Sequence, residues 1–136
     1  MGNAAENEAL MRAVYDRLIN GNSLDEVLRY YDEDIFWRTS PGPNPLFGDR
    51  RGREELRSYL ELTAGAIEEF SLTLEAMVAN DDEVISAHHE FIRRTDGREL
   101  DVDVCVRWRI ANGKVTECWE FAYQGLAVHE FFMDLA

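Results

Sequence analysis

The stretch that decides the fold is EVISAHHEFIRRTDGRELDVDVCVRWRIANGKVTECWEF, residues 83–121. Apolar and polar side chains alternate along three segments of it, which is the period of β-strands. Asp96-Gly97 and Asn112-Gly113 separate the segments, and both dipeptides favour the two-residue turns of tight hairpins. The stretch therefore predicts three antiparallel strands, at 83–94, 100–110 and 115–121.

Counting outward from two-residue turns gives a register for these strands. Val104 then opposes His89 on one side and Phe121 on the other, and one face of the sheet is apolar except for His89. That face carries Ile85, Ala87, His89, Phe91, Val102, Val104, Val106, Trp108, Ile110, Val115, Trp119 and Phe121. The opposite face carries charges of both signs, so we expect helices to cover the apolar face.

The flanking segments supply those helices. Apolar residues recur every three or four positions at 6–20, at 24–31 and from Gly52 onward, which predicts three amphipathic helices. A short strand at Ile35–Thr39 precedes a Pro-rich loop at 40–45, and 71–77 adds a fourth strand to the meander. The apolar segment after Gly125 is expected to dock as a short helix. The pattern predicts one α+β domain over 1–136, a cone-shaped roll of N-terminal helices on a curved, mainly antiparallel sheet.

Composition limits the partners. Acidic residues outnumber basic ones 27 to 14, giving a net charge of −13, and this field repels nucleic acid and anionic lipid. No secretory signal or apolar run of membrane-spanning length is present, so a cytoplasmic protein is expected. Cys105 and Cys118 indicate reduced thiols, and no ligand spacing indicates a metal site.

Three motifs, in this order and spacing, resemble one known superfamily. They are Tyr31-Asp-Glu-Asp-Ile-Phe-Trp37, Pro45-Leu-Phe-Gly-Asp-Arg-Arg-Gly-Arg-Glu-Glu-Leu56 and Asn112-Gly-Lys-Val-Thr-Glu-Cys-Trp-Glu-Phe121. Together they resemble the nuclear-transport-factor-2-like superfamily, in its SnoaL-like and ketosteroid-isomerase-related branch, over roughly residues 6–135. The resemblance implies a cone that admits a ligand, often in homodimers, with chemistries from isomerisation to cyclisation and plain binding.

The family's catalytic sets are incomplete here. Alignment with ketosteroid isomerase puts Tyr15 at the oxyanion tyrosine, Thr39 at the aspartate base and Val104 at the second acid. Gln124 stands near the acidic base of the cyclases, and an amide is no useful base near neutral pH. Function therefore has to be argued from the residues present.

His89 and Tyr15 are the catalytic candidates. A desolvated, neutral His89 is a competent base, and Tyr15 could donate to a substrate carbonyl. Each residue has a structural alternative as a hydrogen-bonded core side chain. The expected ligand contacts are Trp37, Thr39, Tyr59, Phe91, Val104, Val106, Trp119 and Phe121.

Several alternatives stay open at this point. A fully packed core would show the same pattern as a cavity. If the faces are inverted, Glu90, Asp103, Cys105 and Glu120 form an acidic cluster in which one carboxyl pKa rises. The hypothesis is a cofactor-independent isomerase, cyclase or lyase acting on an apolar carbonyl compound, in a homodimer. The alternative is a non-catalytic binding protein for a hydrophobic metabolite or a partner domain.

Overall fold

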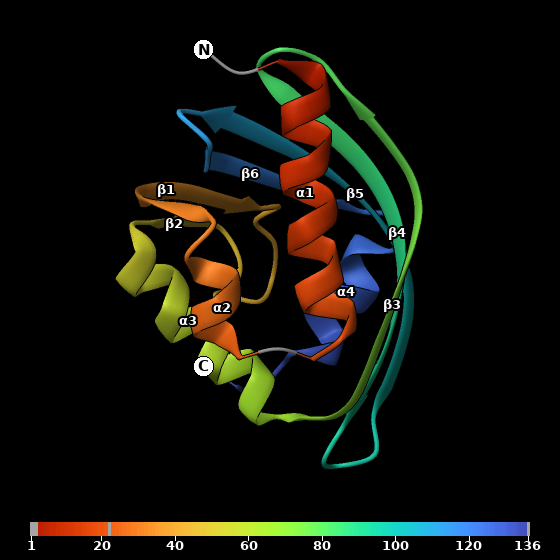
Figure 1. The fold of residues 1–136 in the computed structure, drawn as a ribbon. Helices are drawn as coiled ribbons and strands as arrows, with labels where there is room; N and C mark the ends of the chain where they lie inside the picture. Colours follow the sequence, from red (N-terminus) through yellow and green to blue (C-terminus); the bar gives the residue numbers. More distant parts are fainter. Residues whose placement is uncertain (1–2, 22, 136) are drawn as a thin grey trace.

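The computed structural model describes residues 3–21 and 23–135. The elements follow in the order α1 (Ala4–Ile19), α2 (Leu24–Leu28), β1 (Tyr31–Thr39), β2 (Asp49–Arg51), α3 (Arg53–Gly65), β3 (Ile67–Ala79), β4 (Glu83–Arg94), β5 (Glu99–Ala111), β6 (Lys114–Ala122) and α4 (Gly125–Phe131). The strands form a six-stranded sheet in the order β2-β1-β6-β5-β4-β3. Figure 1 shows this sheet curving around α1, with α2 and α3 beside β1 and β2. The α+β roll predicted from the sequence is confirmed.

The start of the sheet differs from the prediction. Tyr31, placed in the second helix by the sequence pattern, instead begins β1, which starts four residues before the predicted strand and runs parallel to β6. The backbone N–H of Val115 donates to the carbonyl of Tyr30 at 2.9 Å, and Tyr31 is fully buried beside it. Tertiary pairing therefore overrides the local helical period. The three-residue β2, which pairs with β1, was not predicted.

The turn between β4 and β5 has three residues rather than two. Arg94 N–H donates to the carbonyl of Arg98, Gly97 N–H donates to that of Arg94, and Gly97 has a φ of +93°. This is a turn followed by a left-handed glycine, a common three-residue hairpin loop. The expected register is therefore wrong by one residue, and His88, not His89, lies opposite Val104.

A second one-residue shift affects β6. The Asn112-Gly113 turn has two residues as predicted, and both have positive φ. A bulge then shifts the register between Arg109 and Ile110. One extra residue in a strand reverses the face of every later side chain. The prediction that Trp119 and Phe121 lie on the apolar face is therefore wrong, and Cys118 and Glu120 take their places opposite Trp108 and Val106.

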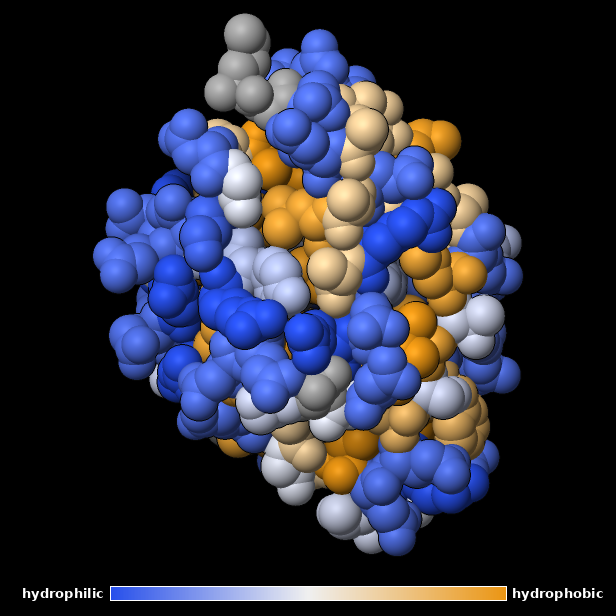
Figure 2. All heavy atoms as spheres, in the orientation of Figure 1, coloured by the Kyte–Doolittle hydropathy of each residue, from blue (hydrophilic) through white to orange (hydrophobic). Residues whose placement is uncertain are grey.

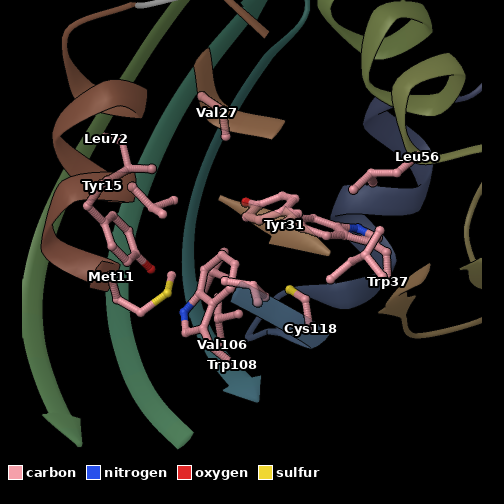
Figure 3. Close-up of a cluster of buried hydrophobic side chains, with 14 of the residues drawn as sticks. Met11, Tyr15, Val27, Tyr31, Trp37, Leu56, Leu72, Val106, Trp108 and Cys118 are labelled. Carbon is pink, nitrogen blue, oxygen red and sulfur yellow. The ribbon is translucent and has the colours of Figure 1, made fainter. Parts of the chain in front are cut away.

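The inner face of β5 is where the prediction holds, since Val102, Val104, Val106, Trp108 and Ile110 are all buried. Around them pack Tyr15 and Met11 of α1 and Tyr31 and Trp37 of β1, as Figure 3 shows. The predicted C-terminal helix is present as α4. Within the described ranges, no helix has the length and apolarity needed to cross a membrane.

Candidate functional site

A cavity of about 750 Å³ lies between the helices and the inner face of the sheet. This volume is in the usual range of small-molecule sites. Most of the wall is apolar and aromatic, and Leu18, Leu24, Ala64, Ile67 and Phe70 contribute to it from α1, α2, α3 and β3. Figure 2 shows hydrophobic residues reaching the surface alongside α1, between hydrophilic ones. The sequence left open whether the apolar face of the sheet encloses a cavity or a fully packed core, and the structure shows a cavity.

The structure brings some of the expected ligand contacts together and separates others. Trp37, Tyr59, Val104 and Val106 line the cavity. Thr39 lines a smaller hollow of about 60 Å³ beside it, and its hydroxyl donates to the carbonyl of Gly48 at 3.0 Å. The side chains of Phe91, Trp119 and Phe121 do not line the cavity, because the two register shifts place them on the outer face of the sheet.

His89 also lies on the outer face, which corrects the expected position of this residue. Its ring bonds Asp103 through Nδ1 at 2.8 Å and Asp101 through Nε2. These hydrogen bonds, that to Asp103 first, raise the pKa of His89 above its ordinary value. An imidazole that lies on the outer face and bonds two carboxylates lacks the desolvation expected for a neutral base in the cavity.

Tyr15 is on the cavity wall, where its hydroxyl joins a chain of hydrogen bonds. The hydroxyl lies 2.7 Å from Ser86 Oγ and 2.7 Å from His88 Nδ1. Ser86 also accepts from the Trp108 indole at 2.9 Å, and His88 Nε2 lies 3.0 Å from Glu90 Oε1. Figure 3 shows Tyr15 and Trp108 turning their polar atoms toward the same side of the core.

The direction of this chain follows from the protonation of the His88 ring. With a neutral ring that carries its proton on Nε2, His88 donates to Glu90 and its Nδ1 accepts from Tyr15. Tyr15 has then used its one proton and accepts from Ser86, while Ser86 accepts from the indole of Trp108, which can only donate. Burial raises the pKa of Tyr15, so its hydroxyl keeps the proton that this arrangement requires. Both ring nitrogens of His88 and the proton of Tyr15 are thus engaged within the protein.

Glu120 is the second carboxyl of the cavity. It is placed on the inner face by the bulge in β6, opposite Val106 of β5 and Thr39 of β1. No hydrogen bond to its side chain is present among the described residues, in contrast to Glu90. Burial, with a smaller contribution from Glu90, raises the pKa of Glu120 to about 8. Glu120 is therefore largely protonated at neutral pH, and its acid group faces the cavity.

Glu90 and Glu120 were part of the acidic cluster considered for an inverted sheet, and half of that cluster exists. The two glutamates line the cavity, whereas Asp103 and Cys105 are exposed on the outer face. His88 and Ser86, which sequence reasoning left on the polar face, complete the site. Gly97 was the available signal, because a left-handed glycine ending a three-residue turn predicts this register. The described residues contain no cluster of three potential metal ligands.

Helix α4 closes one end of the cavity. Val128 and Phe132 form part of the wall, and the buried His129 fastens α4 to the Pro-rich loop. His129 Nδ1 accepts from the backbone N–H of Asn44 at 3.1 Å, and Nε2 donates to the carbonyl of Ser40 at 3.0 Å. Arg94 holds the end of the helix by donating to the carbonyls of Phe131 and Met133.

Comparison with known proteins places the chain in a family. A search of proteins with curated function gives no match. Among solved structures, Bal32a from a soil-derived mobile gene cassette is 29% identical, with a TM-score of 0.79 over 94% of this chain and 97% of that one. TerC, co-crystallised with polyporic acid, is 18% identical, with a TM-score of 0.80 over 93% and 97% of the two chains.

A putative SnoaL-like polyketide cyclase from Jannaschia sp. CCS1 has the same fold at 14% identity, with a TM-score of 0.79 over 94% of this chain and 92% of that one. The family model of the SnoaL-like domain matches residues 11–118, which include the helices and strands that carry Tyr15, His88 and Glu90. The chain belongs to the SnoaL-like domain family of the nuclear-transport-factor-2-like superfamily.

Proposed function

We propose that this protein is a cofactor-independent enzyme that moves a proton on a small, largely apolar carbonyl compound, as an isomerase, cyclase or lyase. One observation carries the proposal, namely two carboxyl groups in different environments on the wall of one apolar cavity. Glu90 accepts a hydrogen bond from His88, whereas Glu120 has no hydrogen-bond partner among the described residues and a pKa of about 8. We assign Glu90 as the base and the protonated Glu120 as the acid of the reaction.

The proposed reaction begins at the carbon next to the substrate carbonyl. The free carboxylate oxygen of Glu90 takes a proton from this carbon, and the electron pair of the broken C–H bond forms the C=C bond of an enol. Glu120 gives its proton to the carbonyl oxygen in the same step, so no free enolate charge develops in the cavity. Return of the first proton from Glu90 to another carbon of a conjugated enol gives an isomer, and attack of the enol carbon on an electrophile closes a ring. In either case the enol O–H proton goes back to the Glu120 carboxylate as the C=O bond forms again.

His88 and Tyr15 act behind Glu90 in this scheme. Because both nitrogens of His88 are engaged, we assign the ring to positioning Glu90 rather than to taking the proton itself. Tyr15 fixes the ring through Nδ1. This assignment replaces the expected roles of His89 as base and Tyr15 as carbonyl donor, since the Tyr15 proton is already donated to His88.

The charge of the wall limits the substrate. Its formally charged side chains within the described part of the chain are Glu61, Glu90 and Glu120, and it contains no lysine or arginine. An acidic substrate would be desolvated there without a counter-ion, which is strongly unfavourable. We therefore propose a neutral ligand. The co-crystallisation of TerC with polyporic acid supports a ligand-holding role for this fold.

Exchange of carbon-bound hydrogen tests the proposal. In D2O, the protein should accelerate deuterium incorporation next to the carbonyl of 2-tetralone, a neutral bicyclic ketone, followed by NMR. Glu90→Gln should lower the rate by roughly 10²–10⁴-fold, the range for loss of a general base. Glu75→Gln, at an exposed position of β3 outside the cavity wall, is the matched control and should keep the rate. Exchange at the buffer rate would reject the enzyme.

The second candidate is a non-catalytic binding protein for a hydrophobic metabolite. It is favoured by the hydrogen bonds of Ser86, Tyr15 and His88. These three side chains bond to other protein groups, so they have no free donor or acceptor directed at a substrate. Saturable binding of 2-tetralone by calorimetry, without any accelerated exchange, would select this candidate over the enzyme.

We also propose a homodimer and a cytoplasmic location. The outer face of the sheet is not covered by any described helix, and it exposes Ile85 and Phe121, 40% and 51% accessible, among charged residues. A second copy would cover this face. Sedimentation should give twice the 15.7 kDa mass of one chain at micromolar concentration.

The two free cysteines support the proposed cytoplasmic location, because thiols stay reduced in that compartment.

A further inference from the structure

Tyr59 of α3 presents to the cavity a hydroxyl that has no partner among the described residues. It is part of the cavity wall, where α3 lies beside β1 and β2 (Figure 1). The hydroxyl of Tyr15, in contrast, already bonds Ser86 and His88. Tyr31 also lacks a recorded partner, but it is only 1% exposed and leaves little room for a ligand atom. Tyr59 is partly accessible, so its hydroxyl proton is available to a molecule in the cavity.

Two contacts fix the ring of Tyr59. The guanidinium of Arg50 in β2 lies over the ring, 4.9 Å from its centroid, and the ring of Phe47 packs against it edge to face at 6.3 Å. Arg50 is held in turn, because its guanidinium donates to the backbone carbonyls of Leu46 and Asp49. A cation within about 6 Å of an aromatic ring is attracted to the face of the ring. The Tyr59 ring is therefore held at the cavity wall by the protein itself.

The register of the sheet places Arg50 and the acid Glu120 on the same face. Arg50 lies opposite Trp37 of β1. Thr39, two residues further along β1, lies opposite Glu120 of β6. Arg50 and Glu120 are thus two strand spacings apart, roughly 10 Å across the sheet. Because Tyr59 packs on Arg50, its hydroxyl and the carboxyl of Glu120 border the same part of the cavity. In accord with this, Glu120 is the largest contributor after burial to the raised pKa of Tyr59, which keeps the phenol protonated.

Two protonated oxygen groups without partners among the described residues therefore meet at one place in the wall. Glu120 and Tyr59 do not bond each other, so both can donate to an acceptor atom that lies between them. A carbonyl oxygen has two lone pairs and can accept from both groups at once. Paired donors of this kind stabilise the negative charge that develops on the oxygen when the neighbouring C–H bond breaks.

We propose that Tyr59 is a further catalytic residue, whose hydroxyl donates to the substrate carbonyl oxygen that takes the proton of Glu120, and that Arg50 is its positioning residue. The proposal rests on the proton transfer proposed above and adds the second donor. Tyr59 keeps its proton, and its hydrogen bond strengthens as charge develops on the oxygen. The Arg50 cation favours negative charge on the phenol and so makes the hydroxyl a stronger donor.

Infrared spectroscopy of bound 2-tetralone, labelled with ¹³C at the carbonyl, tests this contact. A hydrogen bond weakens the C=O bond, so each donor lowers its stretching frequency. Tyr59→Phe should raise the frequency of the bound ketone, because one of two donors is lost while the ring is kept. Tyr123→Phe removes a hydroxyl from a residue that is 84% exposed and outside the cavity wall, and it should keep the wild-type frequency.

The exchange reaction gives a second measurement. Tyr59→Phe should lower kcat for deuterium incorporation by roughly 10²-fold and change KM by less than about threefold, because the donor acts mainly on charge that develops in the transition state. Tyr123→Phe should keep both constants. Thermal unfolding followed by circular dichroism checks that each variant is folded.

Two variants test the positioning role of Arg50. Arg50→Met removes the cation but keeps a long side chain, and it should lower kcat by roughly threefold to tenfold and raise the carbonyl frequency. Arg50→Lys keeps a cation without the planar guanidinium, so it should recover part of both. A lower melting temperature in Arg50→Met with an unchanged carbonyl frequency would overturn the positioning role.

The outcomes separate Tyr59 from the enzyme itself. Exchange by the wild type, with an unchanged rate and carbonyl frequency in Tyr59→Phe, would overturn the role of Tyr59 and leave the transfer between Glu90 and Glu120 standing. If the wild type binds 2-tetralone without exchange, the proposed enzyme fails, and a raised frequency in Tyr59→Phe still supports Tyr59 as the donor to the carbonyl. Failure of the wild type to bind 2-tetralone would overturn both.

Discussion

The hydroxyl oxygen of Tyr15 lies 2.7 Å from Nδ1 of His88, and this contact joins helix α1 to the inner face of the sheet. The two residues are 73 positions apart in the chain and both are buried. Their rings also meet edge to face, with centroids 5.4 Å apart. The position of the carboxyl group of Glu90 in the cavity therefore depends on how the first helix docks.

Replacement of Tyr15 by Phe tests this dependence. Tyr15→Phe keeps the ring but leaves Nδ1 of His88 and the hydroxyl proton of Ser86 without their partner in the core. Loss of one partner from a buried network costs roughly 1–3 kcal/mol of unfolding free energy. Urea denaturation measures this. Tyr30→Phe removes a hydroxyl that bonds the guanidinium groups of Arg29 and Arg17 at the surface, and it should change stability by less than about 0.5 kcal/mol.

The neighbouring histidines offer a paired test. His88→Ala should reduce ketone exchange and stability together, because it removes the group that holds Glu90 and leaves the hydroxyl proton of Tyr15 without its acceptor. His89→Ala should leave the exchange rate unchanged, since its ring lies on the outer face. Both variants remove one imidazole, so composition is matched. Equal loss of exchange in the two variants would contradict the assignment of His88 to the cavity.

The sequence was sufficient to predict the order of the elements except the short β2, because hydrophobic period and turn residues are local signals. It also gave the correct inner face of β5, on which Val104 and Trp108 are buried. The residues of β4 and β6 that lie opposite each residue of β5 were assigned wrongly. One extra residue in the Thr95-Asp96-Gly97 turn reversed the assignment of the two faces of β4, and one extra residue in β6 reversed it for the later part of that strand. Register depends on such single residues, and a period of two cannot reveal them.

The polar groups of the site were hidden for a related reason. Ser86, His88, Glu90 and Glu120 alternate with less polar neighbours, which is the pattern of a solvated face. Their burial is stable only because α1 and β5 supply Tyr15 and Trp108 as partners and the cavity leaves room beside Glu120. Partners so distant in sequence cannot be inferred from a strand's own pattern.

Glu120 should make stability and exchange depend on pH. Its pKa of about 8 in the folded protein lies above the ordinary value of 4.5. Between pH 4.5 and pH 8, therefore, Glu120 holds a proton in the folded protein but has lost it in the unfolded chain. Stability must therefore fall as the pH rises from 4.5 through 8, and Glu120→Gln should flatten this part of the profile. Denaturation at pH 5, 7 and 9 measures the effect. Exchange catalysed by the wild type should also fall as the pH passes about 8, because the acid is lost.

Glu75→Gln is the control for the pH experiment, since it removes one carboxyl at an exposed position of β3. Its denaturation profile should follow that of the wild type over the whole range. A Glu120→Gln profile parallel to the wild type would show that Glu120 has an ordinary pKa and is not the acid of the proposed reaction.

The fastening of α4 predicts the effect of a methyl group at Gly42. A Cβ built at this position would lie 2.6 Å from Cε1 of His129, so Gly42→Ala must displace the ring and its bonds to Ser40 and Asn44. Loss of these bonds should cost roughly 1–3 kcal/mol and loosen α4 together with the residue that follows it, which supply Val128 and Phe132 to the cavity wall. We expect a lower melting temperature, faster proteolysis near the C-terminus and weaker binding of 2-tetralone.

Gly65→Ala is the control for this prediction. A Cβ at Gly65 meets nothing within 4 Å, so this variant should leave stability within about 0.5 kcal/mol of the wild type. His129→Ala removes the ring that the new methyl would strike, so the double variant G42A/H129A should be no less stable than His129→Ala alone. Additive losses in the double variant would mean that Gly42 acts through the loop backbone and not through His129.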